Sequence, residues 1–164
     1  MSEIEGYRDR VERARQELAA LPAVGSGRLG PPDPTTGERW DRSHVLAHLA
    51  EMLPYWTEQV RAVLAGGAEM GRTEADWQRR RRALDSAHER TETALRGAVA
   101  DGIEGLRSLL AAMTDDDLDR QLTFHGHAGD RRLTLAGALE EVLVGHLEAH
   151  LRQLAELTPT AGEG

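Results

Sequence analysis

The chain has 164 residues, a net charge of −8, no cysteine, and 20 basic residues that are all arginine. This length predicts one domain with a sizeable core. The lack of cysteine excludes disulfides and thiolate metal ligands, and the lack of lysine excludes Schiff-base chemistry and a phosphate-loop lysine. The negative charge argues against nonspecific nucleic-acid binding.

Neither a targeting segment nor a membrane span is visible in the sequence. The first ten residues, MSEIEGYRDR, are charged and lack the apolar centre of a signal peptide. No apolar run approaches the roughly 18–20 residues that a spanning helix needs. We therefore expect a soluble cytoplasmic protein with no membrane partner.

The first predicted helix covers Glu3–Leu21. Its apolar residues recur at helical spacing: Ile4, Tyr7, Val11, Ala14, Leu18 and Leu21. Pro22 ends the helix. The next segment, Pro22–Arg39, is rich in glycine and proline and predicts a loop longer than the usual length of about 4–6 residues. Two interpretations of it stay open, a border of a binding pocket and a plain connector.

A second helix is predicted over Ser43–Ala65, with Asp41 or Ser43 as its N-terminal cap. Pro54 lies in the middle of this helix and predicts a kink. His44 and His48 are four residues apart, so they lie one turn apart on the same side. His48 falls at the edge of the apolar stripe, whereas His44 lies in the first turn, where we expect it to meet solvent.

The third predicted helix begins at Glu74 after the capping residue Thr73 and runs to Ala100, or onward to Ala112. Its expected inner stripe has seven members: Trp77, Arg81, Leu84, His88, Thr91, Leu95 and Ala98.

Four consecutive arginines, Arg79–Arg82, cover every side of this third helix, so most of them should be solvated. Arg81 is the one whose spacing places it inward, where it could meet an anionic ligand. We expect His88 to be a half-exposed side chain.

The segment between the third and the last helix carries turn signals. Thr114 followed by three aspartates predicts a capped helix start, because the calcium-loop spacing is missing. Residues Gln121–Leu133 predict a turn or a short hairpin. Within it, His125 and His127 alternate, so they are either additional ligands or, as we favour, exposed loop residues.

The last predicted helix, Leu135–Leu157, is capped by Thr134. Its apolar stripe includes two histidines: Leu135, Leu139, Leu143, His146, His150, Leu154 and Leu157. Two histidines on one buried stripe need partners for several ring nitrogens, and a divalent metal is one such partner. A structural or proton-linked role is the alternative. We predict one domain over residues 1–157 and a disordered tail over residues 158–164.

A histidine pair on one helix and a third histidine from another helix would make a facial site for a first-row metal. Three neutral imidazoles leave the ion's charge of +2 uncompensated, which acidifies a bound water or thiol. The sequence motifs of two classes of hydrolase are missing, because the chain has neither Gly-x-Ser-x-Gly nor His-Glu-x-x-His.

Three stretches of the sequence resemble the DinB-like (DinB/YfiT) metalloenzyme superfamily. They are Trp40 with VLAHLAE around His48, then RRLTLAGALEEVLVGH, then GHLEAHLRQL. The resemblance implies an all-α four-helix bundle with an up-up-down-down course and a long loop after the first helix. It also implies that His48, His146 and His150 bind a divalent ion, with zinc or nickel expected.

Related proteins implied by the resemblance are mycothiol-dependent maleylpyruvate isomerases and mycothiol or bacillithiol S-transferases. We therefore expect a metal-dependent transferase that joins a low-molecular-weight thiol of the mycothiol type to an electrophile. A metal-dependent hydrolase and a non-enzymatic, stress-related metal-binding bundle are the alternatives. Trp56, Tyr55 and Arg81 are the expected substrate-binding residues, and a homodimer is a further expectation. The sequence does not identify the acceptors behind the ligand histidines; Glu51, three residues after His48, is one candidate.

Overall fold

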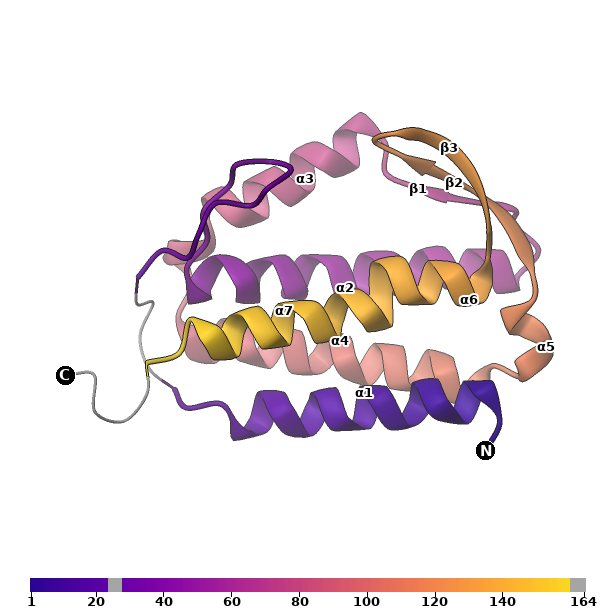
Figure 1. Ribbon diagram of the computed structural model, residues 1–164, viewed down its shortest axis with the longest axis horizontal. Coiled ribbons are helices and arrows are strands. Elements are labelled where there is room, and N and C mark those ends of the chain that lie inside the picture. Colours follow the sequence, from indigo (N-terminus) through magenta and orange to yellow (C-terminus); the bar gives the residue numbers. More distant parts are fainter. Residues whose placement is uncertain (24–27, 160–164) are drawn as a thin grey trace.

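The computed structural model of the protein describes residues 1–23 and 28–159. In this part of the chain, long helices lie side by side, and a short helix and a small sheet lie on one face of them (Figure 1). The long helices are α1 (Glu3–Ala20), α2 (Arg42–Leu64), α4 (Glu92–Ala112), and a composite of α6 (Leu135–Ala138), the π-helical turn η2 (Leu139–Leu143) and α7 (Val144–Glu156). Within the described residues, no helix combines the length and apolarity that crossing a membrane requires.

Hydrogen bonds at the helix ends fix the direction in which each helix runs. At the start of α4, Arg96 donates to the Leu18 and Leu21 carbonyls at the end of α1, so these two helices are antiparallel. At the start of α2, Arg42 pairs with Glu92 at the start of α4, so α2 and α4 are parallel. Figure 1 shows α7 running back against α2.

The course of the helices is therefore up-down-down-up, and the expected up-up-down-down course is wrong. The reason lies in the connection between α2 and α4. The short helix α3 (Glu74–Asp85) and the 3-10 turn η1 (Ala87–Glu89) carry the chain back along α2 before α4 begins (Figure 1). As a result, α2 and α4 start at the same end of the molecule.

The core lies between the long helices and follows the predicted apolar stripes. Ile4, Tyr7, Val11, Ala14 and Leu18 are buried on α1 as predicted. The buried residues of α2, α4 and α7 complete one continuous cluster. Asp41 is the N-cap of α2, where its carboxylate accepts the backbone N–H of His44. The predicted stripes therefore describe the inner faces of α1 and α7 correctly. On α4 only Leu95 of the expected stripe is buried, and the rest of the inner face was not predicted: Val99, Ile103, Leu106, Leu109 and Leu110.

The third predicted helix is interrupted, contrary to the expectation that it continues through residues 86–91. Helix α3 ends at Asp85, and Thr91 caps a new helix by accepting the backbone N–H of Ala94 at 3.1 Å. Thr91 was expected in an inner stripe, but its hydroxyl satisfies a free N–H better at a helix start than in a helix interior. His88 consequently lies in η1.

The last predicted helix has the predicted extent but contains a π-helical turn, η2. A π-turn inserts one extra residue into a helix and is often found beside functional sites. Gly145 follows it, and a Cβ atom at this position would overlap the Glu140 carbonyl oxygen. The glycine therefore permits the close backbone approach of this turn.

A small sheet lies outside the predicted all-α class. Strands β2 (Gln121–Gly126) and β3 (Gly129–Thr134) form the antiparallel hairpin predicted for this segment. Strand β1 (Glu69–Gly71) joins β2 in parallel, with Met70 opposite Phe124. Strand β1 has only three residues, too few to show a strand periodicity, so it was not predicted.

Two predicted segments are only partly described. Within the long loop after α1, residues 24–27 lie outside the described residues. The same is true of residues 160–164 in the predicted tail. Thr158, the first residue of that tail, is held in place, because its hydroxyl donates to the Leu154 carbonyl at 2.7 Å and contacts Arg42.

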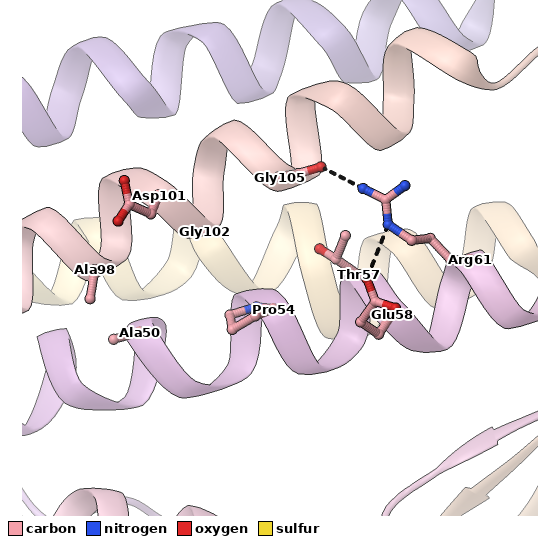
Figure 2. A pocket seen from close by; sticks show the side chains of 9 residues that line it. All are labelled: Ala50, Pro54, Thr57, Glu58, Arg61, Ala98, Asp101, Gly102 and Gly105. Carbon is pink, nitrogen blue, oxygen red and sulfur yellow. Dashed lines mark hydrogen bonds and ion pairs between the residues drawn. The ribbon is translucent and has the colours of Figure 1, made fainter.

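A groove of about 370 Å³ runs between α2 and α4 (Figure 2). It is lined by small residues and by a few charged ones: Ala50, Pro54, Thr57, Glu58, Arg61, Ala98, Asp101, Gly102 and Gly105. No histidine lines it. At Gly102 the two helices approach so closely that an added Cβ would lie 2.8 Å from the Leu53 Cβ atom.

This contact predicts opposite effects for two glycine substitutions in α4. Gly102→Ala should lower the free energy of unfolding by about 1–3 kcal/mol, because the new methyl group forces the helices apart. Gly97→Ala, at an exposed site with no atom within 4 Å, should raise it by about 0.5–1 kcal/mol through its better helix propensity. Urea denaturation measures both, and equal effects would contradict the close packing.

Candidate metal centre

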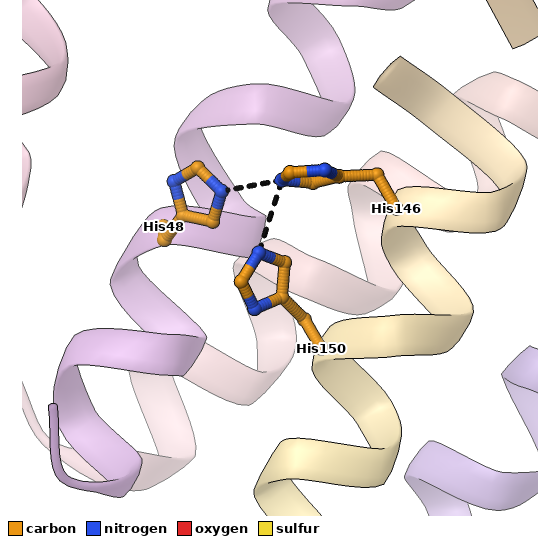
Figure 3. A group of neighbouring side chains, drawn as sticks. All are labelled: His48, His146 and His150. Carbon is orange, nitrogen blue, oxygen red and sulfur yellow. Dashed lines mark hydrogen bonds between the residues drawn. The ribbon is translucent and has the colours of Figure 1, made fainter. Parts of the chain in front are cut away.

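Three histidines meet between α2 and α7 (Figure 3). His48 is buried on the inner face of α2, and His146 and His150 lie one turn apart on α7 and are half-buried. The Nε2 atom of His146 lies 3.0 Å from the Nε2 atoms of both His48 and His150. The structure thus brings together the three residues that the sequence predicts as metal ligands.

The spacing of these nitrogens suits a shared metal ion. Zinc–nitrogen bonds of about 2.0–2.1 Å place two imidazole nitrogens about 2.9 Å apart at a right angle and about 3.4 Å apart in a tetrahedron. The observed 3.0 Å separations lie in this range. A single N–H can bridge only one of two such pairs, so at least one pair of nitrogens needs another partner.

The orientation of His150 is set by a hydrogen bond behind the ring. Its Nδ1 atom lies 2.8 Å from the Gln153 Oε1 atom. A carbonyl oxygen can only accept, so Nδ1 carries the proton and the Nε2 lone pair points toward the other two histidines. Gln153 therefore prepares His150 as a ligand, a role that sequence reasoning did not assign.

The candidate Glu51 does not serve as the acceptor behind His48. Its carboxylate instead forms two 2.8 Å contacts with Arg72 in a buried ion pair. The carboxylate pairs with Arg72 and not with His48, because a two-point contact between a guanidinium and a carboxylate is strong. The Nδ1 atom of His48 has no hydrogen-bond partner among the described residues.

The site keeps its histidines neutral. Burial is the main cause that holds the pKa of His48 well below its usual range, with the neighbouring histidines adding to it. Burial likewise lowers the pKa of His146 to about 3 and lowers the pKa of His150. Because metal binding requires the unprotonated imidazole, all three rings are in the form that can bind a cation at neutral pH.

An aromatic and cationic wall covers the triad. The Trp40 ring stacks on His150 with centroids 5.5 Å apart and lies 5.0 Å from the His48 ring. The Arg80 guanidinium lies over both Trp40 and Trp77, at 5.7 and 5.9 Å from their ring centroids. The positive charge of Arg80 contributes to the lowered pKa of all three triad histidines.

Arg81 was the arginine expected to point inward, but it is exposed and Arg80 takes that position. The difference of one residue arises because Trp77 and Arg80, three residues apart, share the face of α3 that covers the triad. Trp77 lies three residues before Arg80 and four before Arg81, and both spacings place side chains on the same face of a helix, so the sequence does not distinguish the two.

The other two expected substrate-binding residues, Tyr55 and Trp56, surround Arg72 instead. The Arg72 guanidinium lies 4.1 Å from the Tyr55 ring centroid and 5.2 Å from that of Trp56. The Tyr55 hydroxyl donates to the Gly71 carbonyl at 2.7 Å, and burial raises the pKa of Tyr55 to about 12. The aromatic ring in contact with the triad is that of Trp40, which entered the sequence analysis only as part of the motif around His48 and not as a substrate-binding residue.

The remaining histidines lie in two other places. His44 is half-buried, contrary to the expected solvent exposure, because it packs against Asp41 and His88. His125 and His127 lie in and after β2 and are exposed, as favoured. His125 contacts Asp130, and the His127 ring packs 4.0 Å from the Trp77 ring.

Comparison with known families decides the classification. Residues 31–154 match the sequence profile of the DinB superfamily, which is most of the chain. The chain belongs to the DinB superfamily. No curated protein and no solved structure gives a significant match to it. Membership in the DinB superfamily agrees with the predicted resemblance, whereas no particular enzyme of that group is indicated.

The lowered pKa of His146 predicts an acid-sensitive metal-free protein. Between pH 6.5 and about 3, an unfolded His146 binds a proton that the folded form excludes. The free energy of unfolding should therefore fall as the pH is lowered through this window, by at most about 1.4 kcal/mol per pH unit for this one group.

The measurement is urea denaturation at several pH values with a chelator present. The variant His146→Gln removes the titrating group and should show a shallower pH dependence than the wild type. Parallel curves for the two proteins would contradict the lowered pKa.

Proposed function

We propose that His48, His146 and His150 hold a divalent ion, zinc or nickel, and that the protein is a metal-dependent transferase for a low-molecular-weight thiol. The observation that carries the proposal is the meeting of three neutral imidazoles, one buried and two half-buried, in which the Nε2 atom of His146 lies 3.0 Å from the Nε2 atoms of both His48 and His150. A bound divalent ion lowers the pKa of a coordinated thiol and so supplies a thiolate at neutral pH.

The charges around the triad favour an anionic group such as a thiolate. Arg72 is neutralised by its buried partner Glu51. Arg80 has a weaker partner, because the carboxylate of Glu38 is 3.5 Å away and 38% exposed. Arg80 is therefore the arginine available to a substrate, and its guanidinium would hold an anionic group beside the metal.

Trp40 gives the site its apolar side. Its ring lies against two of the three ligands, so it excludes water from that side of the histidines. A thiolate is less strongly solvated than a hydroxide, so a thiolate sulfur suits a wall that is apolar at Trp40 and cationic at Arg80. This charge pattern, together with the family resemblance, favours the transferase over the hydrolase.

The proposal predicts that metal and activity are lost together. His146→Ala should lose one equivalent of tightly held metal, measured by mass spectrometry of the metal content, because two imidazoles bind a first-row ion much more weakly than three. It should also lose turnover of a generic electrophile with added thiols. His127→Ala, at an exposed histidine outside the triad, should retain both.

Three outcomes of this experiment would count against the proposal. Absence of tightly held metal in the zinc-loaded wild type would remove the metal site. Turnover in water without any thiol would favour a hydrolase. A lower melting temperature of His146→Ala, with no turnover by either protein, would favour a non-enzymatic metal-binding bundle.

A second prediction separates two adjacent arginines. Arg80→Gln should raise KM for an anionic thiol by about 10–100-fold with little change in kcat, because it removes a charge-assisted contact worth about 1.5–3 kcal/mol. Arg81→Gln should leave KM unchanged, because this side chain is exposed. Equal effects of the two substitutions on the steady-state kinetics would assign Arg80 a purely structural role.

A further inference from the structure

We propose a second divalent-metal site, formed by Asp41, His44 and His88 and separate from the histidine triad. One carboxylate and two imidazoles are a ligand set that binds zinc, cobalt, iron and manganese. The three residues come from two segments, the first turn of α2 with its N-cap and the 3-10 turn η1. They form a second group whose ligand atoms all lie within 4.8 Å of one another.

The distances resemble those of the triad. The Asp41 Oδ1 atom lies 2.9 Å from the His44 Nδ1 atom, and the Asp41 Oδ2 atom lies 3.1 Å from the His88 Nε2 atom. The two imidazoles meet edge to face with their centroids 5.0 Å apart. Pairs of nitrogen and oxygen ligands on one zinc ion have separations of about 3 Å.

Hydrogen bonds alone leave one contact of this group unsatisfied. The His44 Nδ1 atom lies 3.2 Å from the Asp41 backbone nitrogen, whose N–H calls for an acceptor, and 2.9 Å from the Asp41 Oδ1 atom, beside which only a donor is favourable. This Oδ1 atom already accepts the His44 backbone N–H. One ring nitrogen cannot be both acceptor and donor. If Nδ1 accepts, a lone pair faces a carboxylate oxygen, and a cation beside the two atoms relieves their repulsion.

The surroundings allow metal to enter. The Asp41 side chain is only 7% exposed, whereas His88 is 52% exposed, so the group is closed on the carboxylate side and open to solvent at His88. The N-terminal end of the α2 dipole is positive and disfavours a cation there. We therefore expect this second site to bind more weakly than the triad.

Occupation of the site would join α2 to η1. This turn lies between α3, which carries Trp77 and Arg80 over the triad, and α4. A metal at Asp41, His44 and His88 would therefore fix the end of the segment that covers the triad.

The test is a titration of the metal-free protein with cobalt(II), followed by its visible absorption and by metal analysis after equilibrium dialysis against a fixed cobalt(II) concentration. The wild type should bind two equivalents, His88→Gln one, His146→Gln one, and the double variant none. His127→Gln is the matched control at another exposed histidine and should bind two. His88 is exposed, so its substitution should not alter the circular dichroism spectrum.

The proposal is overturned if His88→Gln binds as many equivalents as the wild type. This outcome is distinct from failure of the triad. If the triad binds no metal, the wild type takes up one equivalent, His88→Gln takes up none, and His146→Gln behaves as the wild type.

Discussion

The burial of three neutral imidazoles at one point between α2 and α7 is the constraint on which the rest of the structure depends. A protonated imidazole is costly to bury in an apolar interior, so the site lowers the pKa of each ring. As a result, the described residues provide hydrogen-bond partners for only some of the ring nitrogens. Gln153 serves one ring, while the Nδ1 atom of His48 has no partner among those residues.

The directions of the helices are related to the position of the histidine triad. His48 and the His146–His150 pair can face each other because α2 and α7 pack as neighbours, with the start of α2 beside the end of α7. The ion pair of Arg42 with Glu92 fixes α4 parallel to α2. Because α2 and α4 are parallel, the segment that connects them must run back along α2. This connecting segment contains α3, which brings Trp77 and Arg80 toward the triad.

Two arginines lie near the triad, and they differ in how far nearby carboxylates compensate their positive charge. Arg72 lies in a buried ion pair with Glu51 and among aromatic rings, so its charge is largely compensated. Arg80 lies between two tryptophans with only a distant carboxylate partner. Both guanidinium groups still lower the pKa of His48 and His146, and Arg80 also lowers that of His150, although the whole chain carries a net charge of −8. Net charge alone therefore says little about which ligands the site would accept.

That His48 joins the His146–His150 pair was implied by the family resemblance. The sequence by itself determined the inner faces of α1 and the last helix, the hairpin, and the caps at Thr73 and Thr134. These features depend on spacing within one helix or turn, where a residue's neighbours are known from the sequence. Only the tertiary structure decided the up-down-down-up course, the inward position of Arg80, the pairing of Glu51 with Arg72, and the group of Asp41, His44 and His88. Each of these depends on contacts between segments far apart in the chain, and local periodicity carries no information about which segments become neighbours.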